Sequence, residues 1–347
     1  MTTTLMVQTD RIFHNLKVIS QRTGGANIIP VLSANAFGLG DVALARLLFE
    51  NGYTLVAVSR IEEALRLSEI NRNLRILILT PYSSENEIRI IVENDFIATI
   101  GSNDCAVLLS GIARQLNKTA SCHIKFDMGS DNSGYLPYDA KKAAQTLKYL
   151  SNLSIEGVYS TLSGKLNEKA ARQQYRRFVE ILNILSKQGI NYGIAHLCST
   201  SSALKFPWAK LDAVRVGEGL CGILSIKDKY GLKRVGRLVS EIADIRWVNK
   251  GFTVGAQRIK IKQNLKVATV PVGYADGLFT GGRNRFSLFG RKKAFCEIAG
   301  RRATIIGKPG YTTTLIDVTN LECKPSDQVS FEVVPLYVNQ GVRREYV

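Results

Sequence analysis

Groups that could transfer protons or bind an anion follow several short apolar stretches of this 347-residue sequence. Lys125 lies in the segment CHIKFDM, Glu218 lies in DAVRVGEG and Tyr274 lies in VPVGYADG. Each of these side chains could donate or accept a proton. The hydroxyls of Thr200 and Tyr346 could donate hydrogen bonds to an anion. These residue types suit acid–base chemistry or the binding of a small anionic ligand.

The cysteines and histidines indicate neither a disulfide framework nor a metal centre. Six cysteines are scattered without a C-x-x-C pair, and several lie in apolar runs, so we expect buried free thiols. The three histidines, His14, His123 and His196, are far apart in sequence and form no H-E-x-x-H motif. We therefore predict no bound metal ion.

The composition is that of a folded and strongly basic protein. Lys and Arg number 46 and Asp and Glu number 29, which gives a formal net charge of +17. A hydrophobic fraction of 45% with 22% charged residues excludes a disordered or collagen-like chain. The N-terminus lacks the features of a signal peptide, and no apolar run reaches 18 residues. We therefore expect a cytoplasmic protein without a membrane span.

Eight short β-branched runs alternate with helical segments in the first two thirds of the chain. The runs cover residues 28–32, 54–59, 75–80, 96–100, 122–128, 154–162, 192–199 and 212–219. Apolar residues at three- and four-residue spacing predict helices between them, for example over residues 41–52, 85–94 and 168–189. This alternation predicts an α/β domain over residues 10–228, a TIM-type (β/α)8 barrel with its site on the loops after the strands. A doubly wound open sheet is the alternative.

The remaining sequence predicts a second domain of β-strands. Runs such as LVSEIADIRWV, TTTLIDVTN and QVSFEVVPLYV are separated by Gly and Asn turns. We assign residues 229–347, together with residues 1–9, to this C-terminal β domain.

Six ordered segments resemble motifs of the alanine racemase family. PVLSANAFGLG at residues 30–40 is similar to the family pattern V-V-K-A-N-A-Y-G-H-G. HIKFDMG, HLCSTS, DAVRVGEGLCG, VPVGYADG and VRREYV follow in the family's order. The resemblance covers nearly the whole chain. It implies a fold-type III pyridoxal-phosphate (PLP) enzyme that forms a head-to-tail homodimer, in which each site is completed by the partner subunit's Tyr274.

The resemblance assigns two catalytic positions, and the first of them is changed. Ser33 stands where the family has the lysine that forms the Schiff base with PLP and shuttles the α-proton. A serine hydroxyl cannot form an imine, and without a neighbouring base it cannot remove an α-proton near neutral pH. Tyr274 keeps the second catalytic position.

Other departures fall in the pocket that the resemblance assigns to the cofactor. Its positions here are Arg215, Thr200, Gly217, Glu218, Tyr346 and Phe37. Phe37 replaces a tyrosine whose hydroxyl contacts the phosphate in the family. The Glu218 carboxylate, at about 6 Å from a phosphate, would cost on the order of 1–3 kcal/mol. These changes predict that the protein has no covalent cofactor and that PLP binding is unlikely.

The positions that line the substrate pocket of the family are also changed. They are Asn132, Thr161, Tyr311, Thr312 and Lys125. Asn132 replaces an arginine beside the substrate carboxylate, and Thr161 replaces a histidine. Tyr311 and Thr312 replace a Met-Asp pair at the substrate entrance, whereas Lys125 matches a lysine that is often carbamylated and structural.

The positions that support the fold match the family, whereas most positions that carry its chemistry are changed. This combination predicts a racemase homologue with a degenerate active site, which acts as a ligand-binding or interaction protein. The alternative is an amino-acid racemase or related isomerase of altered mechanism, with PLP bound non-covalently. A conventional racemase would need another lysine, and after a barrel strand the sequence offers Lys125 and Lys165.

A basic stretch in the C-terminal domain could bind an anionic partner. It runs from Arg283 to Lys308 and includes Arg285, Arg291, Lys292, Lys293, Arg301 and Arg302, opposed by Glu297. Nucleic-acid-binding motifs are absent from the sequence, so nucleic acid is not supported as the partner. An ordinary solvated surface is the alternative.

Overall fold

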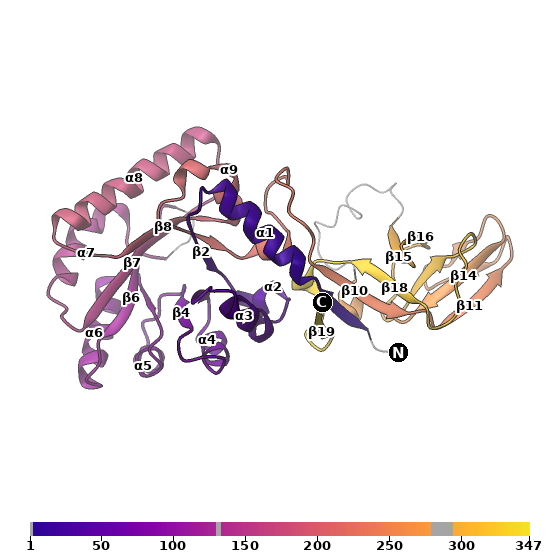
Figure 1. Cartoon of the computed structure of the whole chain (residues 1–347), viewed down its shortest axis with the longest axis horizontal. Helices are drawn as coiled ribbons and strands as arrows, with labels where there is room; N and C mark the ends of the chain where they lie inside the picture. Colours follow the sequence, from indigo (N-terminus) through magenta and orange to yellow (C-terminus); the bar gives the residue numbers. More distant parts are fainter. Residues whose placement is uncertain (1–2, 130–132, 279–293) are drawn as a thin grey trace. The chain divides into compact units, whose positions relative to one another are not determined.

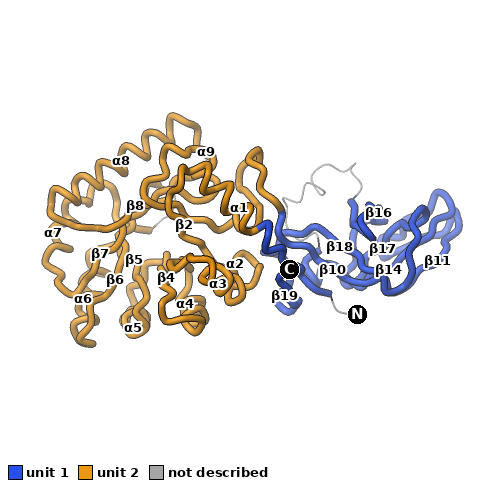
Figure 2. The backbone as a smooth tube through the Cα atoms, viewed as in Figure 1, with its two compact units in different colours: residues 1–11, 234–347 blue, residues 12–233 orange. Residues whose placement is uncertain are grey.

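The computed structural model describes residues 3–129, 133–278 and 294–347. Their contacts divide into two compact units, which Figure 2 shows in orange and blue. One unit comprises residues 12–233, and the other comprises residues 1–11 with residues 234–347. Each unit is described by itself.

Parallel strands in the described part of residues 12–233 form a (β/α)8 barrel (Figure 1). The strands are β2 (Asn27–Pro30), β3 (Leu55–Val58), β4 (Arg75–Ile78), β5 (Ala98–Ile100), β6 (Ala120–Lys125), β7 (Leu153–Leu162), β8 (Ile194–Ser199) and β9 (Ala213–Val216). Six of them pair in the order β2-β9-β8-β7-β6-β5, and β3 pairs with β4. The bridges Val31–Ala57 and Leu77–Ile97 join the two groups and close the barrel. The predicted barrel is confirmed, and the open sheet is wrong.

Helices precede the first barrel strand and connect the later ones, and most of them are amphipathic. They are α1 (Thr9–Arg22), α3 (Asp41–Glu50), α4 (Ile61–Ser68), α5 (Glu85–Glu93), α6 (Asn103–Gln115), α7 (Ala140–Leu147), α8 (Glu168–Lys187) and α9 (Thr200–Lys205). In α8 the buried residues Ala171, Phe178, Ile181 and Leu185 recur at helical spacing, which turns one apolar face inward. Asn167 caps α8 by accepting a hydrogen bond from the Ala170 amide.

The strand interiors supply the barrel core. Ile29, Ala57, Leu77, Ile97 and Ala213 form one buried cluster from neighbouring strands. Parallel barrel strands are covered on both faces, which is why their sequences are continuous apolar runs. This core places the residues after each strand at the carboxyl end of the barrel, where barrel proteins carry their sites.

The other unit is a twisted sheet of mixed strands, and this confirms the predicted all-β character of the C-terminal part (Figure 1). Its order is β11-β14-β17-β16-β15-β18-β10-β1-β19. The bounds are β1 (Thr4–Val7), β10 (Gly236–Glu241), β11 (Asp244–Val248), β14 (Leu265–Val270), β15 (Phe295–Ile298), β16 (Arg301–Ile305), β17 (Thr314–Asp317), β18 (Gln328–Glu332) and β19 (Arg343–Tyr346). A small hairpin pairs β12 (Thr253–Val254) with β13 (Ile259–Lys260). The first strand pairs with the last in parallel, so both ends of the chain belong to this sheet.

Three further findings concern membrane spans, metal ions and cysteines. Within the ranges that the structure describes, no helix is long and apolar enough to cross a membrane. Over those same ranges, no three His, Cys, Asp or Glu side chains are grouped as metal ligands would be. The cysteines are free, and all are buried except Cys323, which is partly exposed.

Candidate functional site

The turn that carries position 33 has a strained, left-handed backbone. The segment α2 (Ser33–Phe37) follows β2, and Ala34, Asn35, Ala36 and Phe37 have φ angles of 55°, 56°, 52° and 55°. Left-handed helical geometry costs a non-glycine residue about 1–2 kcal/mol. Four such residues in succession persist only where the surrounding contacts determine the conformation.

Ser33 contacts a second hydroxyl rather than a base. Its Oγ lies 2.8 Å from the Oγ of Ser59, the residue that follows β3. Neither hydroxyl titrates near neutral pH. The contact therefore leaves Ser33 unactivated as a nucleophile and as a proton acceptor.

Arg215 on β9 is buried inside the barrel, and its guanidinium has several hydrogen-bond acceptors there. Its Nη1 lies 2.8 Å from His196 Nδ1, and its Nη2 donates to Ser160 O at 2.9 Å and to Thr161 Oγ1 at 3.0 Å. The guanidinium also lies 5.0 Å from the centre of the Tyr159 ring. The structure thus brings Arg215 and Thr161, two predicted site residues, into direct contact.

Two histidines extend this network. His196 Nε2 lies 3.0 Å from His123 Nδ1. Because a guanidinium can only donate, His196 Nδ1 must accept from Arg215, and His196 Nε2–H then donates to His123. Burial, with Arg75 and Arg215 adding to it, lowers the pKa of His123 to about 3. Burial and then Arg215 also lower the pKa of His196 well below its usual value, so both rings are neutral.

Sequence reasoning missed this histidine pair, since it treated the two residues as unrelated. One signal was available in the strand between them. Gly157 lies inside β7, and a Cβ there would lie 2.5 Å from the His123 ring. A glycine within a strand often marks such a close approach.

Backbone amides and a hydroxyl gather where β9 ends. Thr200 Oγ1 accepts long hydrogen bonds from the Gly217 and Gly219 amides, at 3.3 and 3.4 Å. Two N–H groups and a nearby hydroxyl are donors that suit a phosphate or another anion. The donor set therefore fits a phosphorylated ligand, although it lacks the hydroxyl that a tyrosine at position 37 would add.

The Glu218 carboxylate beside these amides is bonded to hydroxyls. It accepts hydrogen bonds from Ser201 and Ser225. Charge-assisted hydrogen bonds of this kind offset part of a carboxylate's negative charge. The repulsion toward a bound anion is thus smaller than the sequence predicted.

Lys125 is buried and bonded at the end of β6. Its Nζ donates to Ser133 Oγ at 2.9 Å and lies 5.9 Å from the centre of the Tyr159 ring. Asn132, predicted in the same pocket, lies outside the described residues. The position of Lys125 suits a structural role.

The remaining predicted site residues belong to the β unit. The Tyr274 amide donates to Gly310 O at 3.0 Å, and the Ala275 amide donates to Tyr311 O at 2.9 Å. The structure therefore brings Tyr274 and Tyr311 onto adjoining loops, with Thr312 following directly. Tyr346 lies on β19 and is partly buried.

The predicted basic patch is described in part. Arg301 and Arg302 on β16 and the following Lys308 are exposed. Its members from Arg283 to Lys293 lie outside the described residues. An anionic partner for this surface stays a prediction.

The contact between Phe37 and Gly217 can be tested by substitution. A Cβ on Gly217 would lie 2.5 Å from the Phe37 ring, so Gly217→Ala should lower the free energy of unfolding by about 1–3 kcal/mol. In a Phe37→Leu background the same change should cost less, because the ring edge is gone. Urea denaturation of the native protein, the two single variants and the double variant measures the coupling free energy between the two positions. Backbone effects of Gly217→Ala are common to both backgrounds and cancel from this quantity. Equal costs in the two backgrounds would contradict the contact.

The neutral histidine pair predicts how stability depends on pH. Below the unfolded-state pKa of about 6.5, the unfolded chain binds protons that the folded barrel excludes, so the free energy of unfolding falls as pH falls. The slope should approach about 1.4 kcal/mol per pH unit for each buried histidine. Urea denaturation between about pH 7 and about 5.5 measures it, read from Trp208 after Trp247→Phe leaves that residue as the only tryptophan.

The matched variant is His123→Asn, whose side-chain oxygen can still accept from His196. The chain has three histidines, so removing one of the buried pair should roughly halve the slope. An unchanged slope in this variant would show that the histidine pair is not the source of the pH dependence of stability.

Family models match both parts of the chain. The model described as alanine racemase, N-terminal domain, matches residues 7–225, and the C-terminal domain model matches residues 235–337. Alanine racemase 2 of Caldanaerobacter subterraneus subsp. tengcongensis is 31% identical over 98% of this chain and 87% of that protein. Alanine racemase 1 of Clostridium acetobutylicum is 32% identical over 94% of this chain and 84% of that protein.

Solved structures show the same fold at lower identity. The alanine racemase of Clostridium difficile 630 has a TM-score of 0.87 at 23% identity, over 100% of this chain and 96% of that chain. The histidine racemase from Leuconostoc mesenteroides has a TM-score of 0.84 at 20% identity, over 99% and 98% of the two chains.

These relatives overturn one prediction from the sequence. PLP binding was expected to be unlikely, yet relatives at about 30% identity over more than nine tenths of the chain are alanine racemases, a PLP-dependent family. The sequence argument gave too much weight to Phe37 and Glu218, since the amide donors remain and hydroxyls bond the carboxylate. The ordered motifs, both domain models and the extent of these matches lead to one conclusion: the chain belongs to the alanine racemase family.

Proposed function

We propose that this protein binds PLP at the carboxyl end of its barrel without a covalent bond to residue 33, and that it does not carry out conventional two-base racemisation. The observation that carries the proposal is the contact between the Ser33 and Ser59 hydroxyls, 2.8 Å apart, at the position of the family lysine. This pair offers neither an amine for the cofactor nor a base for an α-proton.

The residues of the barrel supply contacts for each polar part of PLP. The Gly217 and Gly219 amides with the Thr200 hydroxyl would hold the phosphate. The Arg215 guanidinium would face the pyridine nitrogen, as the family resemblance implies. When bound, PLP supplies an aldehyde that reacts with amines and a ring that withdraws electrons.

The hydrogen bonds around Arg215 hold one fixed positive charge at the site. Arg215 stays charged, and its bonds to His196, Ser160 and Thr161 hold the guanidinium in place. Phe37 packs its ring on Gly217 beside the amide donors, where it would shield a bound ligand from water. The chain thus orients and shields an anionic ligand, whereas Ser33 moves no proton.

The substitution Ser33→Lys, which restores the family's lysine at position 33, tests this proposal. Purified with excess PLP and reduced with borohydride, the native protein should carry no covalent PLP, whereas Ser33→Lys should carry it on residue 33. Peptide mass mapping locates the adduct, and the absorbance spectrum before reduction reports the Schiff base. Native racemisation of alanine should be at least about 10²–10⁴-fold below that of a family enzyme, the usual contribution of a positioned acid–base group.

Ser33→Ala is the matched control, because it removes the hydroxyl without adding an amine. Equilibrium dialysis should show that native protein and Ser33→Ala both bind PLP. An adduct of the native protein on Lys125, Lys165 or another lysine would contradict the proposal and favour a conventional racemase that uses that lysine in place of residue 33. Failure of the native protein to bind PLP at all would contradict it as well.

The proposal includes a homodimer in which the partner subunit's Tyr274 completes each site. Tyr274 is 38% exposed and lies on a loop tied to residues 310 and 311, so it is presented by an ordered segment. Sedimentation equilibrium should give twice the mass of one chain. A single-chain mass at micromolar concentration would contradict this part of the proposal.

A further inference from the structure

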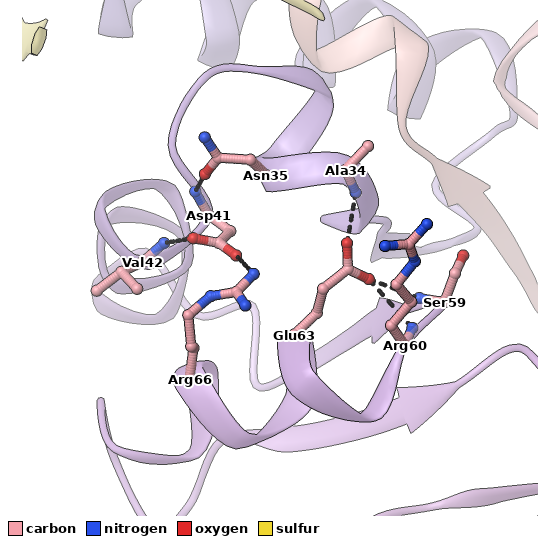
Figure 3. Close-up of polar contacts among 8 residues, drawn as sticks. All are labelled: Ala34, Asn35, Asp41, Val42, Ser59, Arg60, Glu63 and Arg66. Carbon is pink, nitrogen blue, oxygen red and sulfur yellow. Dashed lines mark hydrogen bonds and ion pairs between the residues drawn. The ribbon is translucent and has the colours of Figure 1, made fainter. Parts of the chain in front are cut away.

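Glu63 is a buried carboxylate on α4 that binds the backbone of two strand-end loops (Figure 3). Its Oε1 accepts a hydrogen bond from the Ala34 amide at 2.6 Å. Its Oε2 accepts from the Ser59 and Arg60 amides, each at 3.1 Å. One side chain therefore joins the loop after β2 to the loop after β3.

The bonds from Ser59 and Arg60 are local to the start of α4, whereas the bond from Ala34 is not. Arg60 is the N-cap of α4, and a glutamate at the third helical position commonly accepts from the N-cap amide. Ala34 is 29 positions away and is the first residue of the left-handed stretch. Helix capping alone does not explain why the carboxylate reaches it.

A second residue of α4, Arg66, supports the turn through Asp41. Asp41 donates its amide to Asn35 Oδ1 at 2.9 Å, and its carboxylate pairs with Arg66 at 2.7 Å (Figure 3). Glu63 and Arg66 are three residues apart, so they lie on one face of α4. This face thus contacts the strained segment directly at Ala34 and through Asp41 at Asn35.

This left-handed turn positions two side chains of the candidate site. Ser33 opens it, and Phe37 closes it with its ring against Gly217, whose amide belongs to the donor pair for the anion. The Ser33 partner, Ser59, also has its amide bound by Glu63.

We propose that Glu63 is a positioning residue, which holds the Ser33–Phe37 turn in its left-handed form and so places position 33 and the Phe37 ring at the ligand. The identity of the ligand as PLP rests on the proposed function. The effect on the turn does not, because it concerns the protein's own backbone.

The substitution Glu63→Gln tests the proposal. A glutamine has one accepting oxygen, and its amide nitrogen cannot accept from an N–H, so at least one loop loses its bond. Hydrogen exchange of the peptide covering residues 31–40 should become at least about tenfold faster, while peptides from β7 stay unchanged. The dissociation constant for PLP, measured by equilibrium dialysis, should rise about tenfold, or about 1.4 kcal/mol.

Two further variants separate positioning from general stability. Glu62→Gln changes the exposed neighbour on the same helix and should alter neither quantity. Glu63→Asp keeps the charge on a side chain one methylene shorter, so we expect it to retain the Arg60 cap and lose the Ala34 bond. It should speed exchange in residues 31–40 with little change in the thermal midpoint.

The outcomes distinguish this inference from the proposed function. Unchanged exchange of residues 31–40 in both Glu63 variants overturns the inference, whatever PLP does. Exchange that rises equally in every peptide also overturns it, because Glu63 would then serve only the stability of the barrel. A native protein that binds no PLP overturns the proposed function, while the exchange experiment still decides the role of Glu63. Should Glu63→Gln fail to fold, Glu63→Asp decides.

Discussion

The barrel interior is organised by the burial of one permanent positive charge, the guanidinium of Arg215. Taking such a charge out of water costs several kcal/mol unless acceptors surround it. Here the acceptors are His196, a backbone carbonyl and the Thr161 hydroxyl, with the Tyr159 ring beneath the cation. These contacts make His196 accept at Nδ1, and burial, with the nearby arginines adding to it, keeps both histidines neutral. They also explain why Gly157 has no side chain, since the His123 ring fills that space.

A second constraint lies at the mouth of the same barrel. The left-handed turn after β2 is costly for four non-glycine residues, yet Glu63 accepts a hydrogen bond from its Ala34 amide and the Asp41 amide donates to its Asn35 side chain. In the family this turn carries a lysine, whereas here it carries a serine. The scaffold that positions residue 33 is therefore intact although the amine is gone.

Much of the fold was predictable, because buried parallel strands and amphipathic helices leave local signatures. The runs near Ile29, Leu77 and Ala213 are apolar throughout, since both faces of each strand are covered. Ser33, Thr200 and Arg215 could be placed at strand ends for the same reason. The handedness of the Ala34–Phe37 turn was not predictable, because no glycine signals it and Glu63 is far along the chain.

The sequence by itself determined the order of strands and helices, the family and the absence of an amine at position 33. These follow from residue types and from spacings within a few turns or strands, which are local properties. Only the tertiary structure decided the protonation of His123 and His196 and the bonds of Glu218. Those properties depend on burial and on donors contributed by distant segments, and neither is encoded by neighbours in the chain. The binding of an anion depends on such contacts, which is why the sequence alone misjudged PLP.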